Sequence, residues 1–187
     1  MPPKTKITKE TMLTAALEIV RERGFASINA RKLADKIGCS TQPIFSNYPT
    51  MDALKDDIIA YGGKVYTDYL KTYMAKNEYP PYKASGMAYI RFAEDEKELF
   101  KLLFMRDRTG EDQTVRTEGF EEIIAIAQKN LGISHEMALV FHLEMWVFVH
   151  GIATMIATSY LKFDKDLISR MLSDAYLGIK KQYLSEE

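Results

Sequence analysis

Residues 28–54 decide the fold, and they read INARKLADKIGCSTQPIFSNYPTMDAL. In the first part of this stretch, Leu33, Ala34 and Ile37 recur at the spacing that gives a short helix one apolar face. Asn29 precedes these residues and is expected to cap the helix, because its side-chain oxygen can accept a hydrogen bond from a free backbone N–H group. The pattern therefore predicts a short amphipathic helix that begins after Asn29.

Gly38 predicts the end of this helix, and Ser40 predicts the start of a second one. Glycine readily takes the left-handed conformation found at helix C-termini, and serine is a favoured N-cap residue. Pro43 falls in the first turn of the second helix, where its missing N–H group has no intrahelical partner to lose. Two short helices joined by a tight, glycine-containing turn form a helix-turn-helix, whose second helix enters the major groove of DNA.

These residues resemble the N-terminal DNA-binding domain of TetR-family transcriptional regulators. The family pattern runs Thr-x-Arg-x-Ile-Ala-x-x-Ala-Gly-Val-Ser, then a variable helix with Tyr, His and Phe, then Lys-x-x-Leu. The matching positions of this chain are Asn29, Arg31, Leu33, Ala34, Gly38, Ser40, Phe45, Asn47, Tyr48 and Leu54.

Four positions depart from the family pattern. Phe45, Asn47 and Met51 stand where the family has Tyr, His and Lys, which usually contact DNA phosphates, and Gln42 replaces a common glycine. The resemblance therefore implies a DNA-binding head whose phosphate contacts and base reading differ from those of its relatives.

The composition is that of an ordinary globular protein, with 187 residues, 47% hydrophobic and 27% charged. The net charge of -1 is unevenly divided: residues 1–55 hold nine Lys and Arg against five Asp and Glu, which is +4 and leaves -5 for the remainder. A basic head on an acidic body is typical of a DNA-binding protein, although many soluble domains carry as much charge.

Cysteine content and the N-terminus indicate the compartment. The single cysteine, Cys39, excludes an intrachain disulfide and a cysteine-based zinc site, and it stands where the family pattern has valine, which favours a small apolar role over redox sensing. The N-terminus lacks the apolar run of a secretory signal. We expect a cytoplasmic protein without a cofactor or a bound metal.

The remaining sequence reads as helix throughout, with no internal repeat and no strand-like alternation. We predict an all-α fold of about nine helices, with a helix-turn-helix DNA-binding domain over residues 1–55 and a helical effector-binding and dimerisation domain over residues 56–187. The further helices are expected at 8–23, 51–76, 84–93, 97–105, 115–131, 134–161 and 164–184, with Thr8, Thr50, Ser134 and Asp164 as caps.

Two features of these helices allow competing interpretations. Gly62 and Gly63 fall inside the expected helix 51–76, which should link the two domains, at a cost of about 1 kcal/mol each. Close packing is favoured over a hinge as the reason. Residues 138–157 are apolar and long enough to span a bilayer, but His142, Glu144 and His150 favour a buried core helix and hence no membrane association.

The second helix of the motif carries the expected base-reading residues. Ile44 and Phe45 should pack back, wholly or partly, onto the core of the head, which leaves Thr41, Gln42, Pro43, Ser46 and Asn47 facing solvent. Gln42 is the strongest candidate, because a glutamine can contact N6 and N7 of adenine together. The expected phosphate contacts come from the polar and basic side chains of Asn29, Arg31, Lys32, Ser40, Thr41, Tyr48 and Lys55.

Two strings in the second half resemble the ligand domain of a TetR subgroup, namely Ala88-Tyr89-x-x-Phe92-Ala93 with the Leu99–Phe104 segment, and Trp146 to Gly151. The resemblance implies a small apolar or aromatic effector, a homodimer formed through the last two helices, a palindromic double-stranded operator and the role of a repressor. The aromatic residues that could line the effector site, which core packing would also require, are Tyr66, Tyr69, Tyr89, Phe92, Phe100, Phe104, Trp146 and His150.

The competing function is a helical-bundle protein that binds or converts a small molecule without binding DNA. His142, Glu144 and His150 would be its polar residues, but the two histidines lie two helical turns apart and no third metal ligand has a convincing spacing. This alternative does not explain the N-terminal motif.

Overall fold

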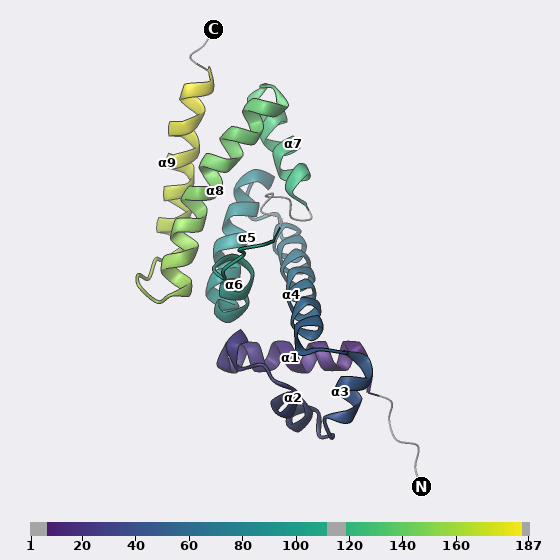
Figure 1. Ribbon diagram of the computed structural model, residues 1–187. Coiled ribbons are helices and arrows are strands. Elements are labelled where there is room, and N and C mark those ends of the chain that lie inside the picture. Colours follow the sequence, from purple (N-terminus) through teal and green to yellow (C-terminus); the bar gives the residue numbers. More distant parts are fainter. Residues whose placement is uncertain (1–6, 112–118, 185–187) are drawn as a thin grey trace. The chain divides into compact units, whose positions relative to one another are not determined.

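The computed structural model describes residues 7–111 and 119–184. In this part of the chain the regular structure consists of nine α-helices and one short 3-10 turn, η1, so the predicted all-α class is confirmed (Figure 1). The elements are α1 (Lys9–Arg23), η1 (Phe25–Ser27), α2 (Ala30–Ile37), α3 (Gln42–Asn47), α4 (Met51–Met74), α5 (Pro81–Asp95), α6 (Lys97–Phe104), α7 (Phe120–Leu131), α8 (His135–Ala157) and α9 (Lys165–Leu184).

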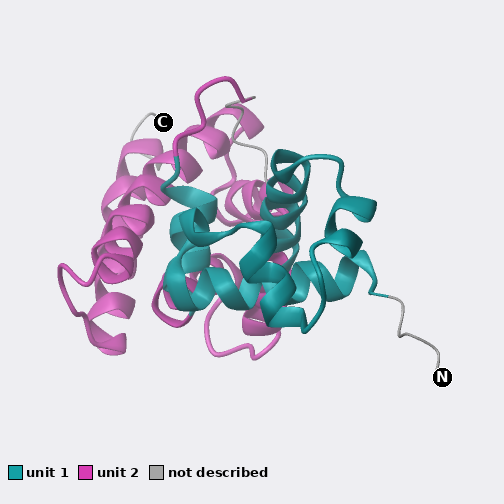
Figure 2. Ribbon diagram, turned by 60° about the horizontal axis from the view of Figure 1, so that its bottom comes forward, with its two compact units in different colours: residues 1–65, 96–106 teal, residues 66–95, 107–187 magenta. Residues whose placement is uncertain are grey.

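The chain divides into two compact units, shown in Figure 2. Unit 1 contains residues 1–65 and 96–106, and unit 2 contains residues 66–95 and 107–187. Helix α4 begins in unit 1 and ends in unit 2, and α6 belongs to unit 1 with the helix-turn-helix.

Side-chain caps set the starts of the helices in unit 1. The Thr8 hydroxyl accepts a hydrogen bond from the Thr11 N–H group at 3.1 Å, and Asn29 Oδ1 accepts one from the Lys32 N–H group at 2.9 Å. The Thr50 hydroxyl accepts from the N–H group of Ala53 at 3.1 Å. All three caps were predicted, and each satisfies a donor that the first turn of a helix leaves free.

The turn between α2 and α3 is only partly as predicted. Gly38 has φ 77° and ψ 38°, the left-handed conformation expected of it. Helix α3 begins one residue later than expected, because Thr41 rather than Ser40 is its N-cap residue and forms no capping hydrogen bond through its side chain. Pro43 lies in the first turn, as predicted.

The core of unit 1 joins the motif to α1 and α4. Met12 and Leu17 of α1, Leu33 of α2, Ile44 of α3 and Leu54 of α4 are all buried almost completely. Helix α1 packs against α2 and also against α6. Figure 1 shows α1, α2 and α3 grouped at the start of α4. The helix-turn-helix is therefore held by apolar side chains from each of its neighbours.

Unit 2 is built around α8, which packs against α5, α7 and α9. The predicted caps are present: the Ser134 hydroxyl accepts from Met137 N–H at 3.2 Å, and Asp164 Oδ1 accepts from Leu167 N–H at 2.7 Å. Helix α8 ends at Ala157 rather than near residue 161, because Ser159 takes a positive φ of 57° that a helix cannot continue through. The expected start of α7 at residue 115 lies outside the described residues.

By length and composition α8 is apolar enough to cross a membrane. It packs against three helices of unit 2, and a third of its most apolar window is buried. Its remaining apolar side chains lie on faces that the described chain leaves partly open.

The glycine pair in α4 is not explained by close packing. A Cβ atom on Gly62 would lie 3.6 Å from Leu103 Cδ2 and 4.0 Å from Leu17 Cδ2, which are ordinary contact distances, and one on Gly63 would meet no described atom within 4 Å. The expectation that tight packing requires these glycines is therefore wrong.

Candidate nucleic-acid interface and effector site

Helix α3 presents a mixed face to solvent. Ile44 and Tyr48 point into unit 1, whereas Gln42 and Ser46, on the opposite side of the helix, are exposed. Phe45 is 51% exposed, so it packs onto the core only in part, whereas Ile44 is fully buried. The Tyr48 ring, one turn after Ile44, is also buried.

Two of the polar residues of α3 bond to their own helix. The Ser46 hydroxyl donates to the Gln42 carbonyl at 2.9 Å, and Asn47 Nδ2 donates to the Pro43 carbonyl at 2.8 Å. Asn47 is half-buried, whereas Thr41 and Gln42 are exposed. Gln42 is therefore the long polar side chain best placed to reach a base edge from this helix.

Tyr48 cannot make the phosphate contact predicted for it. The residue is 2% exposed and its hydroxyl oxygen is buried, while Lys9 Nζ lies 4.5 Å from the centre of its ring. Burial, together with Asp57, raises the pKa of Tyr48 to about 12. Tyr48 stands at the phenylalanine position of the family pattern and is buried, so the prediction of a phosphate contact is wrong.

The other side chains predicted to contact phosphates differ in their exposure and in the contacts that they already make. Asn29 uses its Oδ1 atom as a helix cap, and Lys55 Nζ lies 3.4 Å from Asp52 Oδ1. Arg31 and Ser40 are exposed, and Lys32 is half-buried. The surface near the motif is therefore only modestly basic.

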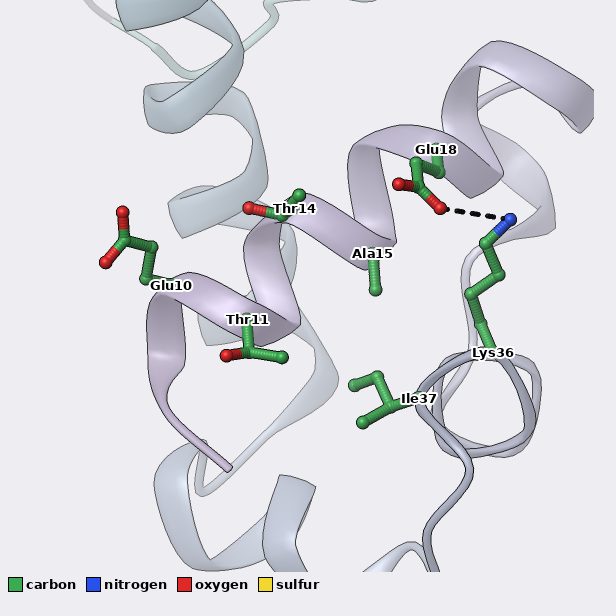
Figure 3. Close-up of a pocket in the computed structure, with 7 residues that line it drawn as sticks. All are labelled: Glu10, Thr11, Thr14, Ala15, Glu18, Lys36 and Ile37. Atoms are coloured by element: carbon green, nitrogen blue, oxygen red, sulfur yellow. Dashed lines mark ion pairs between the residues drawn. The ribbon is translucent and has the colours of Figure 1, made fainter. Parts of the chain in front are cut away.

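A shallow depression of about 460 Å³ lies between α1 and α2, as Figure 3 shows. Lys36 Nζ pairs across it with Glu18 at 3.1 Å and also contacts Glu22 at 2.8 Å. These contacts raise the pKa of Lys36 and lower that of Glu22. The ion pairs tie α2 to α1, which is a structural role. The depression is lined by Glu10, Thr11, Thr14, Ala15, Glu18, Lys36 and Ile37.

Six of the eight predicted effector-site residues form one aromatic cluster in unit 2. The Tyr66 ring lies 6.1 Å from Tyr89 and 5.1 Å from Phe92, with edge-to-face geometry. Tyr69 lies 5.3 Å from Phe92, and Trp146 stacks on His150 at 5.3 Å with an interplanar angle of 26°. The cluster combines residues of α4, α5 and α8 that are far apart in sequence. Its members are Tyr66, Tyr69, Tyr89, Phe92, Trp146 and His150.

The other two predicted effector residues belong to unit 1. Phe100 and Phe104 are neighbours in α6, with ring centres 5.1 Å apart, and Phe100 is fully buried. Helix α6 packs against α1. Within unit 1 these rings therefore contribute to the packing of α6.

Two tyrosine–histidine pairs link α5 to α8. The Tyr89 hydroxyl lies 2.8 Å from His150 Nδ1, and the Tyr82 hydroxyl lies 3.0 Å from His142 Nδ1. Burial lowers the pKa of His150 and lowers that of His142 to about 4, so both rings are neutral near pH 7. A neutral ring can accept a hydrogen bond from the tyrosine hydroxyl at Nδ1 while it carries its own proton on Nε2.

The three polar residues that an enzyme would use, under the alternative hypothesis, do not form a common site. His142 pairs with Tyr82, His150 pairs with Tyr89, and Glu144 accepts a hydrogen bond from the Tyr183 hydroxyl at 3.1 Å. Among the described residues, no group of three His, Cys, Asp or Glu side chains is arranged to hold a metal ion. The geometry assigns these three residues separate packing roles.

Helices α8 and α9 carry an exposed apolar surface. Val140 and Val147 are 46% and 65% exposed on α8, and Leu177 is 56% exposed on α9. A Cβ atom added at Gly151 or Gly178 would meet no described atom within 4 Å. Each helix thus carries exposed apolar residues and a glycine with open space, which permits another helix to approach closely.

The described part of the chain thus combines a helix-turn-helix near the N-terminus with an aromatic cluster in a second helical unit. A sequence profile described as "Tetracyclin repressor-like, C-terminal domain" matches residues 82–175. The crystal structure of a TetR-like transcriptional regulator from Rhodococcus sp. RHA1 shares the fold, with a TM-score of 0.65 and 15% identity over 98% of this chain and 100% of that chain. No curated protein sequence matches the chain.

The chain belongs to the tetracyclin repressor-like (TetR) family of transcriptional regulators. The matched segment runs from α5 into α9 and includes both tyrosine–histidine pairs. The subgroup suggested by Trp146, His150 and Gly151 remains a prediction.

Proposed function

We propose that this protein is a cytoplasmic transcriptional repressor that binds a palindromic operator as a homodimer and leaves it when a small molecule binds the second domain. The observation that carries the proposal is the pair α2 and α3, joined at a left-handed Gly38, with an exposed face on α3. This is the arrangement that places a recognition helix in the major groove. The proposed functional domains are residues 1–55 and 56–187.

Base reading in this proposal depends on Gln42. Its side chain is exposed on the face of α3 opposite Ile44, and it is long enough to donate to N7 and accept from N6 of the same adenine. Thr41, Pro43, Ser46 and Asn47 flank it; the last two must give up bonds to their own helix before they can reach a base.

The phosphate contacts are assigned to side chains around the motif. Arg31, Lys32 and Lys55 would supply charge, and Ser40, Thr41 and Asn29 would supply hydrogen bonds. Because Lys55 is paired with Asp52, it would contribute less than Arg31 at low salt.

A second copy of the chain is the proposed partner for the exposed surface of α8 and α9. Val140, Val147 and Leu177 would be buried against the same helices of the other subunit, with Gly151 and Gly178 as points of close approach. Two heads are needed because one covers only half of a site, and they must lie about 34–36 Å apart or a multiple of that distance.

The aromatic cluster is the proposed effector site, and it favours an apolar or aromatic molecule. Tyr89 and His150 would offer a few oriented polar atoms among stacked rings. An effector that prefers a conformation in which the two heads are wrongly spaced would release DNA, with a coupling of about 1–3 kcal/mol.

A gel-shift experiment with the DNA upstream of the protein's own reading frame tests the proposal. A retarded complex that resists nonspecific competitor and holds two chains per duplex supports it. A folded dimer that gives no specific shift at low salt contradicts it. Log affinity should also fall steeply with log salt, because phosphate contacts release counterions.

A further inference from the structure

Phe45 is the most exposed large hydrophobic side chain in the described part of unit 1, at 51%. It lies in α3, where Ile44 and Tyr48 already fill the core face and are almost fully buried. Leaving a phenyl ring in water forgoes the stabilisation that burial would provide. A partner that binds to α3 would cover this ring and recover that stabilisation.

The position of Phe45 on the helix indicates which partner that is. Phe45 follows Gln42 by three residues, so the two side chains are neighbours on one side of α3. A base-reading Gln42 would bring Phe45 to the same base pair or the next one in the major groove. If α3 enters the major groove, the ring would therefore lie beside the edges of base pairs.

The chemistry of the ring selects one kind of base. Phenylalanine has no hydroxyl group, so it cannot bond to a phosphate as the tyrosine of the family pattern does. In the major groove the apolar feature of a base edge is the C5-methyl group of thymine, which aliphatic and aromatic side chains contact. Cytosine carries only a hydrogen at that carbon, and adenine and guanine have no methyl group on their major-groove edges.

We propose that Phe45 is a specificity-determining residue that contacts the C5-methyl group of a thymine next to the adenine read by Gln42. The proposal rests on the DNA binding proposed above. It adds an apolar contact by Phe45 to the polar contact proposed for Gln42. Burying one methyl group against the ring should raise affinity about 4-fold in each half-site. For both halves of a palindrome the factors multiply to about 15-fold.

The test uses deoxyuridine, which pairs like thymine and lacks only the methyl group. Duplexes that bind the full-length protein are first selected from a random library. The best duplex is then synthesised with its thymines replaced by deoxyuridine, one symmetric pair at a time. Affinities are measured by fluorescence anisotropy for the unchanged protein, for Phe45→Ala and Phe45→Leu, and for Met105→Ala. Met105 is a matched control because it is exposed in unit 1 but outside the helix-turn-helix.

We expect one symmetric thymine pair at which replacement by deoxyuridine lowers the affinity for the duplex about 15-fold. The unchanged protein and Met105→Ala should both show this loss. Phe45→Ala should bind the thymine and deoxyuridine duplexes equally, and Phe45→Leu should keep part of the difference. Two results would overturn the proposal for Phe45 while leaving DNA binding intact. Either the unchanged protein binds every deoxyuridine duplex as tightly as the thymine duplex, or Phe45→Ala loses as much affinity on deoxyuridine substitution as the unchanged protein does. If no duplex is enriched, the proposed function fails and the role of Phe45 fails with it.

Discussion

Arg21 of α1 and Glu96, the residue before α6, are joined by a two-pronged ion pair. Arg21 Nε donates to Glu96 Oε2 at 2.8 Å and Nη2 donates to Oε1 at 2.9 Å, across 75 positions of sequence. The hydrogen bond to Glu96 is the main reason that the pKa of Arg21 is raised. The contact fastens the start of α6 to the helix that supports the helix-turn-helix.

Replacing Arg21 by alanine should lower the free energy of unfolding by about 1 kcal/mol, a value limited by the partial exposure of the pair. Arg21→Lys should recover only part of it, because lysine cannot form two parallel bonds to one carboxylate. Urea denaturation of the variants measures both effects. Arg23→Ala, an exposed change in the same turn, is the control and should alter the value by less than about 0.5 kcal/mol. Equal losses for Arg21→Ala and Arg23→Ala would show that the pair contributes nothing specific.

Acid should destabilise the protein through His142. Its pKa is lowered from 6.5 to about 4 by burial, so the folded protein favours the neutral ring. As pH falls, the unfolded chain binds a proton at this histidine before the folded protein does. The contribution of His142 to the free energy of unfolding is therefore fully present above pH 6.5 and is lost progressively towards pH 4, at up to about 1.4 kcal/mol per pH unit. His150 acts in the same direction.

The variant His142→Gln isolates the contribution of His142 to the pH dependence of stability. Glutamine can still accept the Tyr82 hydrogen bond, but it does not titrate between pH 4 and pH 7. Urea denaturation at pH 5 and pH 7 should show a smaller difference in the free energy of unfolding for the variant than for the unchanged protein. A variant with the unchanged protein's full pH dependence would rule out His142 as the source.

Alanine substitution should have different effects on stability at Gly63 and Gly86, because the space around the two glycines differs. Gly63→Ala should stabilise the protein by up to about 1 kcal/mol, because a Cβ atom meets no described atom within 4 Å and alanine favours the helix. Gly86→Ala places a Cβ atom 3.0 Å from Leu172 Cδ2 and 3.5 Å from Val149 Cγ2, so its neighbours must shift. We expect Gly86→Ala to be the less stable of the two in thermal denaturation. A loss of stability in Gly63→Ala would mean that α4 needs its glycine for another reason.

A charge placed on the exposed surface of α8 should prevent dimerisation. Val147→Glu would bury a carboxylate without a partner in the proposed interface and should weaken association about 100-fold or more. Val147→Leu keeps the surface apolar and serves as the matched control. Sedimentation equilibrium measures both. If Val147→Glu remains as dimeric as Val147→Leu, the subunits do not meet at this surface.

Local rules predicted much of this structure, because their causes lie within a few residues. Thr8, Asn29, Thr50, Ser134 and Asp164 each cap the helix expected of them, since a cap requires only a polar side chain and the free N–H groups that follow it.

The errors concern features that depend on distant parts of the chain. A tyrosine and a phenylalanine three residues apart have similar apolar rings, and only the shape of the core decided that Tyr48 is buried and Phe45 is exposed. The stripe of Phe100 and Phe104 predicts a buried face without naming its partner. Within unit 1, α6 packs against α1, and a place for these two rings in the effector site stays a prediction. The end of α8 was misplaced because residues 158–161 contain no glycine or proline to mark it.

The most direct test of the account is the contact between Gln42 and one adenine. Each A·T pair of the selected operator is replaced in turn, symmetrically in both halves, and affinity is measured for the unchanged protein and for Gln42→Ala. We predict one position in each half-site where the unchanged protein loses about 1–3 kcal/mol per contact and Gln42→Ala loses nothing. If Gln42→Ala discriminates at every position as the unchanged protein does, Gln42 does not read the operator and the assignment of α3 as the recognition helix is contradicted.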